Sequence, residues 1–278
     1  MPELSTIILS YNTQEVTHNC LNYLIRSLND QKAKAEVIVV DNGSTDGSQE
    51  MLLEYAKTIS PNNIDFELIL NRKNLGYPKG NNQGIKKAQG EFVLLLNSDA
   101  YVDNEIDWKE LFHYLRKNQD VGALTVKVKL EDGSIDPASH RGFPTIWRSF
   151  TYLTGLEKVL GKLPLLNRLF GGYHLTHLDL NQIHEIDSPT GAFYLARKEV
   201  LDRVKGFDDI NFFLYAEDLD LSYRIKKFGY KIVYYPKYQV THLKRTSGIE
   251  RKDSRIQKKS KKYFYDSMKV FYKKHYEN

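Results

Sequence analysis

Apolar runs alternate with stretches of helical periodicity through the first hundred residues of the chain. Runs rich in apolar and β-branched residues, which are typical of buried strands, occupy residues 4–9, 36–40, 66–70 and 92–96. Helices are expected between them, in residues 16–28, 51–59 and 79–89. This alternation predicts an α/β fold with a mixed, mostly parallel sheet flanked by helices.

The second half of the chain is less regular. Strands are expected in residues 121–130, 191–196 and 230–235. The last of these strands is expected to close at Pro236, because proline cannot donate a ladder hydrogen bond. A helix over residues 217–228 is expected to end before Gly229, and residues 255–275 predict a basic, tyrosine-rich helix.

Apolar positions also recur between residues 148 and 182, where they indicate one or two amphipathic helices. A lipid-facing surface is one interpretation of this pattern. Packing as core or as a lid is the favoured one, because helical apolar stripes usually face a core. We therefore expect most of these apolar side chains to be covered.

The composition bears on the class of protein and on its cellular compartment. Hydrophobic residues make up 41% of the chain and charged residues 27%, which excludes a collagen-like or wholly disordered protein. No run approaches the roughly 20 apolar residues that a membrane-spanning helix needs, and no basic leader precedes the first apolar run. Cys20 has no cysteine partner for an internal disulfide. We expect a cytoplasmic protein without a secretory signal.

Charge is distributed unevenly along the chain. The net charge is +5, but residues 244–278 hold 12 basic against 4 acidic side chains, a net of +8. The preceding residues hold 28 basic against 31 acidic side chains, a net of −3. A basic tail suggests an anionic partner such as a membrane surface, a nucleic acid or a phosphorylated substrate. The alternative is a solvated helix that packs its tyrosines on the domain.

Polar side chains follow the predicted parallel strands, at the edge of the sheet where such folds bind ligands. They are Ser10, Tyr11, Asn12, Asp41, Asn42, Asn71, Asn97, Ser98 and Asp99. Asp99 could hold Mg²⁺ or Mn²⁺ against a diphosphate, or could simply belong to a turn. Asp41 could accept a hydrogen bond from the imide N–H of a uracil or thymine ring, and Tyr11 could stack on that ring.

Two further groups could carry chemistry. Glu217, Asp218 and Asp220 begin a predicted helix after an aromatic run, where a carboxylate could act as general base. Acids in a first helical turn are also stabilised by the helix dipole alone, so both interpretations stand. His242 could bind a metal or a phosphate, although a lone histidine is more often structural.

Several familiar nucleotide and metal motifs are absent from the sequence. No G-x-G-x-x-G follows the first strand, and neither a P-loop nor a zinc-binding spacing of cysteine and histidine is present. If a nucleotide binds, the charge of its phosphates must be compensated in another way, most simply by a divalent cation held by carboxylates.

Taken together, the ordered motifs resemble the family 2 glycosyltransferases with their GT-A fold. They are I-I-L-S-Y-N at residues 7–12, V-V-D-N-G-S-T-D-G at 39–47, N-L-G at 74–76, L-L-N-S-D at 95–99 and E-D at 217–218. The motifs S-P-T-G-A at 188–192 and G-F-D at 206–208, with His242, are similar to the rhamnosyltransferase-like branch. The resemblance implies a GT-A domain over residues 1–245, with a nucleotide-binding half (1–100) and an acceptor-binding half (101–245). Residues 246–278 would form a basic helical C-terminal extension.

The resemblance also implies roles for individual residues. The nucleotide would lie against Ser10, Tyr11, Asn12, Asp41, Asn74, Gly76, Asn97 and Ser98. Asp99 would be the final acid of a D-x-D-type metal motif, although this chain has one acid there where many members have two. His242 would be a further metal or diphosphate contact. Asp218 would be the general base supported by Glu217, and the sugar and acceptor would lie over Gly191 and Ala192.

The function that the resemblance implies is a metal-dependent inverting glycosyltransferase using Mn²⁺ or Mg²⁺. It would move a sugar, with rhamnose one candidate, from a UDP- or dTDP-sugar to a saccharide acceptor, polyprenyl-linked in bacterial polysaccharide synthesis. Such an enzyme would work at the inner face of the cell membrane, and no nucleic acid is expected. The alternatives are a nucleotidyltransferase, whose glycine-rich basic signature the first strand lacks, and a non-catalytic protein that binds nucleic acid or membrane. The oligomeric state stays open.

Overall fold

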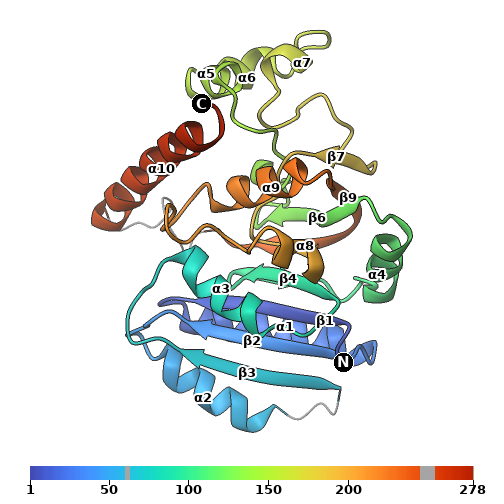
Figure 1. Cartoon of the computed structure of the whole chain (residues 1–278), viewed down its shortest axis with the longest axis vertical. Helices are drawn as coiled ribbons and strands as arrows, with labels where there is room; N and C mark the ends of the chain where they lie inside the picture. Colours follow the sequence, from blue (N-terminus) through green and yellow to red (C-terminus); the bar gives the residue numbers. More distant parts are fainter. Residues whose placement is uncertain (60–62, 245–253, 278) are drawn as a thin grey trace.

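The computed structural model describes residues 1–59, 63–244 and 254–277 (Figure 1). The elements follow in chain order: β1 (Leu4–Ser10), α1 (Gln14–Asp30), β2 (Ala35–Asp41), α2 (Ser48–Thr58), β3 (Ile64–Leu70), α3 (Tyr77–Lys87), β4 (Phe92–Asn97), β5 (Ala100–Val102), α4 (Trp108–Lys117), β6 (Val121–Leu130), the 3₁₀ turn η1 (Pro137–Ser139), α5 (Ile146–Leu153), α6 (Leu156–Leu160), α7 (Asn167–Phe170), β7 (His184–Ile186), β8 (Tyr194–Arg197), α8 (Lys198–Arg203), α9 (Glu217–Lys227), β9 (Lys231–His242) and α10 (Ser254–His275). The strands and helices predicted for the first hundred residues are confirmed.

All these strands belong to one sheet, in the order β3-β2-β1-β4-β8-β6-β9-β5, with β7 paired to β9. Strands β1, β2, β3, β4, β6 and β9 run in one direction, and β5, β7 and β8 run in the other. The predicted mixed, mostly parallel sheet is therefore confirmed. Its register pairs Ser10 with Asp41 and Leu9 with Asn97, so three strands end at the same edge.

Helices cover both faces of this sheet, because successive strand residues point to opposite faces. On one face, Ile8, Val39 and Leu94 belong to a buried cluster with residues of α1, α2 and α4. On the other, Ile7 and Leu95 belong to a cluster with residues of α3, α8 and α9. This double cover explains why the parallel strands are apolar on both faces.

Two predicted strand boundaries in the second half are wrong. Strand β8 begins at Tyr194, because Gly191 and its neighbours form a turn that approaches the end of β4 instead. Strand β9 continues through Pro236 to His242. Its pairing with β6 shifts register between Tyr235 and Gln239, so the proline lies in an irregular part of the ladder, where its missing N–H is tolerated.

The segment between residues 148 and 182 also departs from expectation. It contains the short helices α5, α6 and α7, and much of its apolar surface faces solvent: Leu165 is 95% exposed, Val159 67% and Leu153 62%. The expectation that most of these apolar side chains are covered is wrong. A run of short helices joined by turns cannot present one continuous stripe to the sheet, so several positions are left outside.

Helix α10 packs its aromatic side chains on the domain. Phe271 is fully buried against residues that include Phe212 and Leu219, and Tyr263 stacks on Phe213 with ring centroids 5.1 Å apart. The predicted tyrosine-rich helix is confirmed. Of the two interpretations left open for the tail, packing on the domain is observed for these aromatic side chains, whereas Tyr265 is 55% exposed. The expected boundary between residues 245 and 246 lies outside the described residues.

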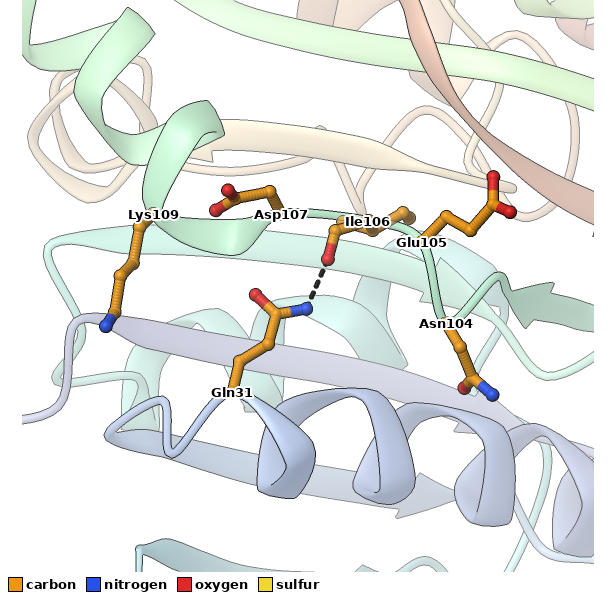
Figure 2. Close-up of a pocket in the computed structure, with 6 residues that line it drawn as sticks. All are labelled: Gln31, Asn104, Glu105, Ile106, Asp107 and Lys109. Carbon is orange, nitrogen blue, oxygen red and sulfur yellow. Dashed lines mark hydrogen bonds between the residues drawn. The ribbon is translucent and has the colours of Figure 1, made fainter.

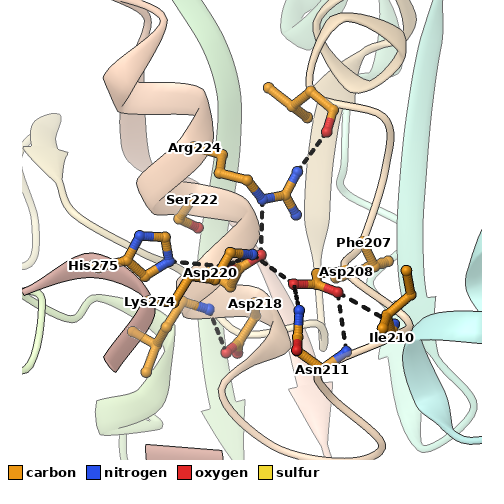
Figure 3. Close-up of polar contacts among 12 residues, drawn as sticks. Phe207, Asp208, Ile210, Asn211, Asp218, Asp220, Ser222, Arg224, Lys274 and His275 are labelled. Carbon is orange, nitrogen blue, oxygen red and sulfur yellow. Dashed lines mark hydrogen bonds and ion pairs between the residues drawn. The ribbon is translucent and has the colours of Figure 1, made fainter. Parts of the chain in front are cut away.

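A buried carboxylate ties α10 to α9, as Figure 3 shows. Asp220 of α9 is fully buried and accepts from Arg224 Nε at 2.8 Å, Lys274 Nζ at 2.6 Å and His275 Nε2 at 2.8 Å. Burial alone would raise the pKa of Asp220, but His275, Arg224 and Lys274 outweigh it and lower that pKa. The carboxylate therefore stays ionised and fixes the end of α10.

Among the helices of the described residues, none is both long enough and apolar enough to cross a bilayer.

Candidate active site

The carboxyl ends of β1, β2 and β4 bring the predicted polar residues to one edge of the sheet. Ser10 and Asp41 are the last residues of β1 and β2, and Asn97 is the last residue of β4. The loops that follow these strands therefore start side by side. This is the position at which open α/β sheets bind ligands.

Asp41 is fully buried and uses only one of its carboxylate oxygens within the protein. Oδ1 accepts from the backbone N–H groups of Gly43 at 3.1 Å and Ser44 at 2.9 Å, and from Gln49 Nε2 at 2.7 Å. Oδ2 is buried and has no hydrogen-bond partner among the described residues. A buried oxygen of this kind is costly unless a donor reaches it, so Oδ2 is a candidate acceptor for a ligand.

Tyr11 and Asn12 form the rim beside Asp41. Tyr11 is 42% exposed, which leaves its ring accessible to a stacking ligand. Asn12 has a left-handed backbone with φ of 53°; its N–H donates to Ser44 Oγ at 2.9 Å, and its Oδ1 accepts from the Thr45 N–H at 2.8 Å. Asn12 therefore ties the loop after β1 to the loop after β2.

Ser10 and Ser98 lie in a buried cluster of hydroxyl groups. Thr17 Oγ1 donates to Ser10 Oγ at 3.3 Å, and Thr13 Oγ1 lies 2.9 Å from Thr17 Oγ1 and 3.4 Å from Ser98 Oγ. Ser10 is 0% exposed and Ser98 9%. The hydroxyl groups of these two serines form part of the floor of the site. Their predicted contact with a nucleotide stays a prediction.

Asn74 and Gly76 shape the loop before α3. Asn74 Oδ1 accepts from the Gly76 N–H at 2.8 Å and from Asn42 Nδ2 at 3.0 Å. Gly76 has φ of 91°, and a Cβ there would come within 2.8 Å of both the ring and the carbonyl of Phe213. Glycine is therefore required at position 76, where this loop meets the segment that leads into α9.

Gly191, Asn97 and Tyr77 meet in the centre of the site. Tyr77 OH donates to Asn97 Oδ1 at 2.9 Å, and the Asn97 N–H donates to the Gly191 carbonyl at 3.1 Å. A Cβ on Gly191 would lie 2.3 Å from Tyr77 OH. Ala192 is fully buried, so it supports this turn from below.

Tyr77 also links the two ends of the site electrostatically. Burial raises the pKa of its hydroxyl well above the usual range, and the negative charges of Glu217, Asp218 and Asp99 raise it further. The negative charges of the carboxylates predicted for catalysis and for metal binding thus all act on Tyr77, which is partly buried.

Asp99 and His242 come together through the pairing of two short stretches of strand. Ala100 of β5 pairs with His242 of β9, which places Asp99 Oδ1 3.2 Å from His242 Nε2. His242 Nδ1 lies 3.1 Å from Oδ2 of Asp136, which is fully buried and also accepts from Lys244 Nζ at 3.0 Å. Burial lowers the pKa of His242, but hydrogen bonds to Asp136 and Asp99 outweigh it and raise that pKa to about 9.

Asp99 and His242 are the candidate ligands for a divalent cation at this point. Within residues 1–59, 63–244 and 254–277, no three His, Cys, Asp or Glu side chains gather as a complete ligand set. Mg²⁺ and Mn²⁺ commonly take one or two protein carboxylates and complete their shell with water and substrate phosphate oxygens. Asp99 and His242 fit that partial role, provided that His242 gives up the proton it shares with Asp99.

Glu217 and Asp218 begin α9 after a strained turn. Tyr215 and Ala216 both have left-handed backbones, with φ of 71° and 60°. Asp218 Oδ2 accepts from Arg141 Nη2 at 2.5 Å, and Oδ1 accepts from the Leu219 N–H at 2.7 Å. Arg141 also donates to the Pro189 carbonyl at 2.7 Å, so the loop after η1 fixes this carboxylate.

Glu217 lies in a different environment from its neighbour. Its Oε2 is buried and has no hydrogen-bond partner among the described residues. Burial, and then the charge of Asp218, raise the pKa of Glu217 to about 8, although Arg141 opposes this. Two adjacent acids with such different surroundings are suited to different tasks in acid–base chemistry.

A separate hollow lies at the opposite edge of the sheet (Figure 2). It is lined by Gln31, which follows α1, and by residues 104–107 and Lys109. Helix α1 starts where β1 ends, so its far end lies at the edge where the parallel strands begin. Gln31 Nε2 donates to the Ile106 carbonyl across this hollow. The hollow is therefore unrelated to the residues described above.

Sequence patterns missed three residues that hold the site together. Tyr77, Asp136 and Arg141 contact Asn97, His242 and Asp218 respectively. Asp136 stands just after the Asp132–Gly133 turn of a predicted strand, which was the only local indication. Their positions depend on contacts between distant segments, so spacing along the chain did not identify them.

Comparison with known sequences places this arrangement in context. The family model described as "Glycosyl transferase family 2" matches residues 5–174. The poly-beta-1,6-N-acetyl-D-glucosamine synthase of Staphylococcus epidermidis is 24% identical over 236 residues, which are 84% of this chain and 48% of that protein. The N-acetylglucosaminyl-diphospho-decaprenol L-rhamnosyltransferase of Mycobacterium tuberculosis is 28% identical over 220 residues, 75% of this chain and 66% of that protein. The chain thus spans about half the length of the first relative.

Solved structures share the fold. Staphylococcus aureus TarS matches with a TM-score of 0.58 at 20% identity, over 87% of this chain and 36% of that one. A mannosyltransferase from Pyrobaculum calidifontis, in complex with GDP-Man and Mn²⁺, matches with a TM-score of 0.56 at 19% identity, over 87% and 56%. A TarS fragment in complex with UDP-GlcNAc matches with a TM-score of 0.56 at 23% identity, over 87% and 59%. These likenesses confirm the predicted GT-A fold.

Proposed function

Because the chain belongs to glycosyl transferase family 2, we propose that it moves a sugar with inversion from a nucleoside-diphosphate sugar to a saccharide acceptor. Two features of the site together carry this proposal. Asp41 has a buried carboxylate oxygen, Oδ2, without a partner among the described residues, and the adjacent acids Glu217 and Asp218 begin α9, whose preceding segment meets α3 where the Phe213 carbonyl accepts from the Tyr77 N–H at 2.9 Å. The first suits recognition of a nucleobase, and the second suits removal of a proton.

The donor would bind along the ends of β1, β2 and β4. Asp41 Oδ2 would accept from the imide N–H of the base, and the exposed ring of Tyr11 would stack on it. A carboxylate acceptor suits the imide N–H of uracil or thymine, and we therefore propose a UDP- or dTDP-sugar as the donor. Asn12, Asn74 and Gly76 would keep the surrounding loops in place through the hydrogen bonds described above.

The chemical step needs one proton acceptor from the protein. Asp218 would take the proton of the acceptor hydroxyl, whose oxygen then forms a bond to the anomeric carbon as the bond to the diphosphate oxygen breaks. The acceptor hydroxyl would compete with Arg141 for Asp218 Oδ2. Glu217 would support Asp218 by keeping a proton in its buried position, which avoids two adjacent negative charges. Inversion requires no protein nucleophile.

The leaving group would depart beside Asp99 and His242. A Mn²⁺ or Mg²⁺ ion held there would neutralise the charge that develops on the diphosphate. In its absence His242, with a pKa of about 9, is an imidazolium between Asp99 and Asp136. Asp136 would orient the imidazole ring in either case.

The acceptor and the location are argued from the relatives. One acts, by its name, on a lipid-diphosphate acceptor as a rhamnosyltransferase, and another makes a polysaccharide. We propose for this chain a polyprenyl-linked saccharide acceptor, with rhamnose as a candidate sugar, and a role in bacterial cell-surface polysaccharide synthesis. The protein would be peripheral at the cytoplasmic face of the membrane.

A donor panel with matched variants tests the reaction. Wild type and Asp218→Asn are incubated with UDP- and dTDP-sugars, Mn²⁺ and a saccharide acceptor, and release of nucleoside diphosphate is measured. Loss of the base should slow turnover by a factor of about 10² to 10⁴. The exposed Asp266→Asn serves as the matched control and should keep wild-type turnover. Full activity of Asp218→Asn would overturn the assignment of the base, and pyrophosphate release from a nucleoside triphosphate would favour a nucleotidyltransferase instead.

A further inference from the structure

The short helices α5, α6 and α7 carry an unusual share of the exposed apolar surface. The large hydrophobic side chains exposed among the described residues number 21, and 10 of them lie between residues 146 and 169. They are Ile146, Trp147, Phe150, Tyr152, Leu153, Val159, Leu163, Leu165, Leu166 and Leu169. We call residues 146–169 the apolar layer. Such a concentration marks an interaction surface, because apolar side chains scattered singly are the norm elsewhere.

Contacts within the apolar layer and with α10 hold the layer in place, so its exposed side chains belong to a packed structure. Trp147 Nε1 donates to the Leu169 carbonyl at 2.7 Å, and its ring lies 5.6 Å from that of Phe170. Ser149 Oγ lies 2.7 Å from Tyr272 OH of α10. Figure 1 shows the three helices together at one end of the molecule, beside the end of α10. The exposed residues therefore belong to a formed surface.

The exposed charges of the apolar layer are all positive. Lys158, Lys162 and Arg168 are exposed. The layer contains one acid, Glu157, which is 5% exposed and accepts from the backbone N–H of His174 at 2.9 Å, with its other oxygen 2.8 Å from His174 Nδ1. Apolar side chains with lysine and arginine, and without an exposed acid, are typical of helices that lie in the headgroup region of an anionic bilayer.

A segment that flanks the apolar layer contacts the candidate general base. Arg141, which contacts Asp218, lies five residues before the layer, and Tyr173 lies four residues after it. The Gly142 N–H donates to the Tyr173 carbonyl at 2.8 Å, which closes the two ends of the segment together. A surface on which this segment rests would thus lie on the acceptor side of the site.

We propose that the apolar layer docks the protein on an anionic lipid bilayer, with its apolar side chains inserted among the lipids and its three cations at the phosphate level. This deepens the proposed function, on which it rests for the lipid-linked acceptor: the docked surface would present such an acceptor to Asp218. It also places the membrane contact on the layer, whereas the basic tail helix packs its aromatic side chains on the domain.

A second copy of the chain fits this surface less well. Two layers placed face to face would bring Lys158, Lys162 and Arg168 of each copy together without an exposed acid to pair with them. Like charges at the core of an interface cost free energy, whereas lipid phosphates compensate them.

Vesicle co-sedimentation of the full chain tests the proposal. The vesicles contain phosphatidylcholine alone or with about 30% phosphatidylglycerol. Wild type should bind the anionic vesicles, and the triple variant Ile146→Ser, Val159→Ser, Leu165→Ser should bind them about tenfold or more weakly. The control removes exposed apolar side chains elsewhere, with Leu53→Ser, Ile210→Ser and Phe228→Ser, and should bind as wild type does.

A second pair of variants tests the charges separately. Lys158→Glu with Lys162→Glu should weaken binding to anionic vesicles, whereas Lys32→Glu with Lys34→Glu, at the other end of the sheet, should not. These exposed positions are also expected to leave folding intact if the serine triple does not fold.

Stabilisation of each variant by UDP or dTDP separates this proposal from the proposed function. Lost vesicle binding with unchanged nucleotide stabilisation supports docking by the apolar layer. Vesicle binding that persists in the triple variant overturns the docking proposal, and so does a wild type that fails to bind anionic vesicles. If wild type is a dimer in sedimentation velocity and the triple variant is a monomer, the docking proposal is also overturned, in favour of a second copy. Absence of nucleotide stabilisation in wild type counts against the proposed function alone.

Discussion

The two adjacent acids at the start of α9 differ because their surroundings differ. Asp218 accepts from a guanidinium, whereas Glu217 has a buried oxygen without a partner and a pKa of about 8. The contrast comes from burial at Glu217, whose effect on the pKa Arg141 opposes, and from the ion pair that Arg141, on a distant loop, makes with Asp218.

The raised pKa of Glu217 predicts a pH dependence of stability. Its pKa is about 8 in the folded state and 4.5 in an unperturbed chain. Between these values the folded state binds more protons than the unfolded state, so the free energy of unfolding should fall as pH rises from about 5 to about 8. Urea denaturation across this range should show that slope, and Glu217→Gln should make the slope shallower.

The control for this experiment is Glu54→Gln, whose side chain is 71% exposed beside Lys57. It should keep the wild-type slope. Parallel profiles for wild type and Glu217→Gln would show that Glu217 titrates in the folded protein as it does in the unfolded chain.

At the scale of elements, helix α10 depends on one buried charge. Asp220 contacts the cations Arg224 and Lys274 and the imidazole of His275, and the last two of these belong to α10 (Figure 3). Replacing it by asparagine leaves Arg224, Lys274 and His275 without their common anion. We expect Asp220→Asn to lower the free energy of unfolding by about 3–5 kcal/mol, the usual cost of breaking a buried ion pair.

Urea denaturation checks this value, and limited proteolysis should show earlier cleavage in α10. The exposed Asp266→Asn, on α10 itself, is the control and should change stability by less than about 0.5 kcal/mol. An Asp220→Asn protein as stable as wild type, with α10 equally protected, would show that aromatic packing alone holds the helix.

The elements that the sequence predicted best are those with one dominant local pattern. Strands β1, β2 and β4 are buried on both faces, so their apolar runs were unambiguous. Helix α4 also has a clear pattern, with buried Trp108, Leu111 and Leu115 and an Asp107 cap, yet it was not among the predictions. The extent of β9 was hidden by Pro236, because the local rule for proline ignores a shift of register.

The site residues also differ in how well the local sequence predicts their positions. Those at strand ends, such as Asp41 and Asp99, were predictable because topology gathers the ends of parallel strands. Ser10 and Ser98 stand at those ends too, yet they face a buried hydroxyl cluster. Side-chain direction depends on the packing of α1 beneath them, which spacing along the chain does not encode.

At the scale of the whole molecule, the two halves expected from the sequence share one sheet. Strand β4 pairs with β8, and one buried cluster contains both Leu4 and Val240. We therefore expect residues 1–100 and 101–245 to unfold together. Circular dichroism and tryptophan fluorescence should give coincident urea transitions, and two separated transitions would show that the halves are independent units.

The same scale explains why the apolar layer escaped prediction as a surface. A hydrophobic period indicates that a helix has an apolar face, but not what covers that face. In residues 146–169 the face turns outward, and only the assembled molecule shows that nothing among the described residues covers it. The vesicle-binding experiment described above tests whether a lipid bilayer covers this face.

The central claim is that the edge formed by β1, β2 and β4 binds a nucleoside diphosphate, and thermal stabilisation by UDP, dTDP and GDP with Mn²⁺ or with EDTA tests it most directly. A ligand at 100 times its dissociation constant should stabilise the protein by about 2.7 kcal/mol. The account predicts stabilisation by UDP or dTDP, stronger with Mn²⁺, and its loss in Asp41→Asn. No stabilisation by any nucleotide at millimolar concentration, or equal stabilisation of Asp41→Asn, would contradict it.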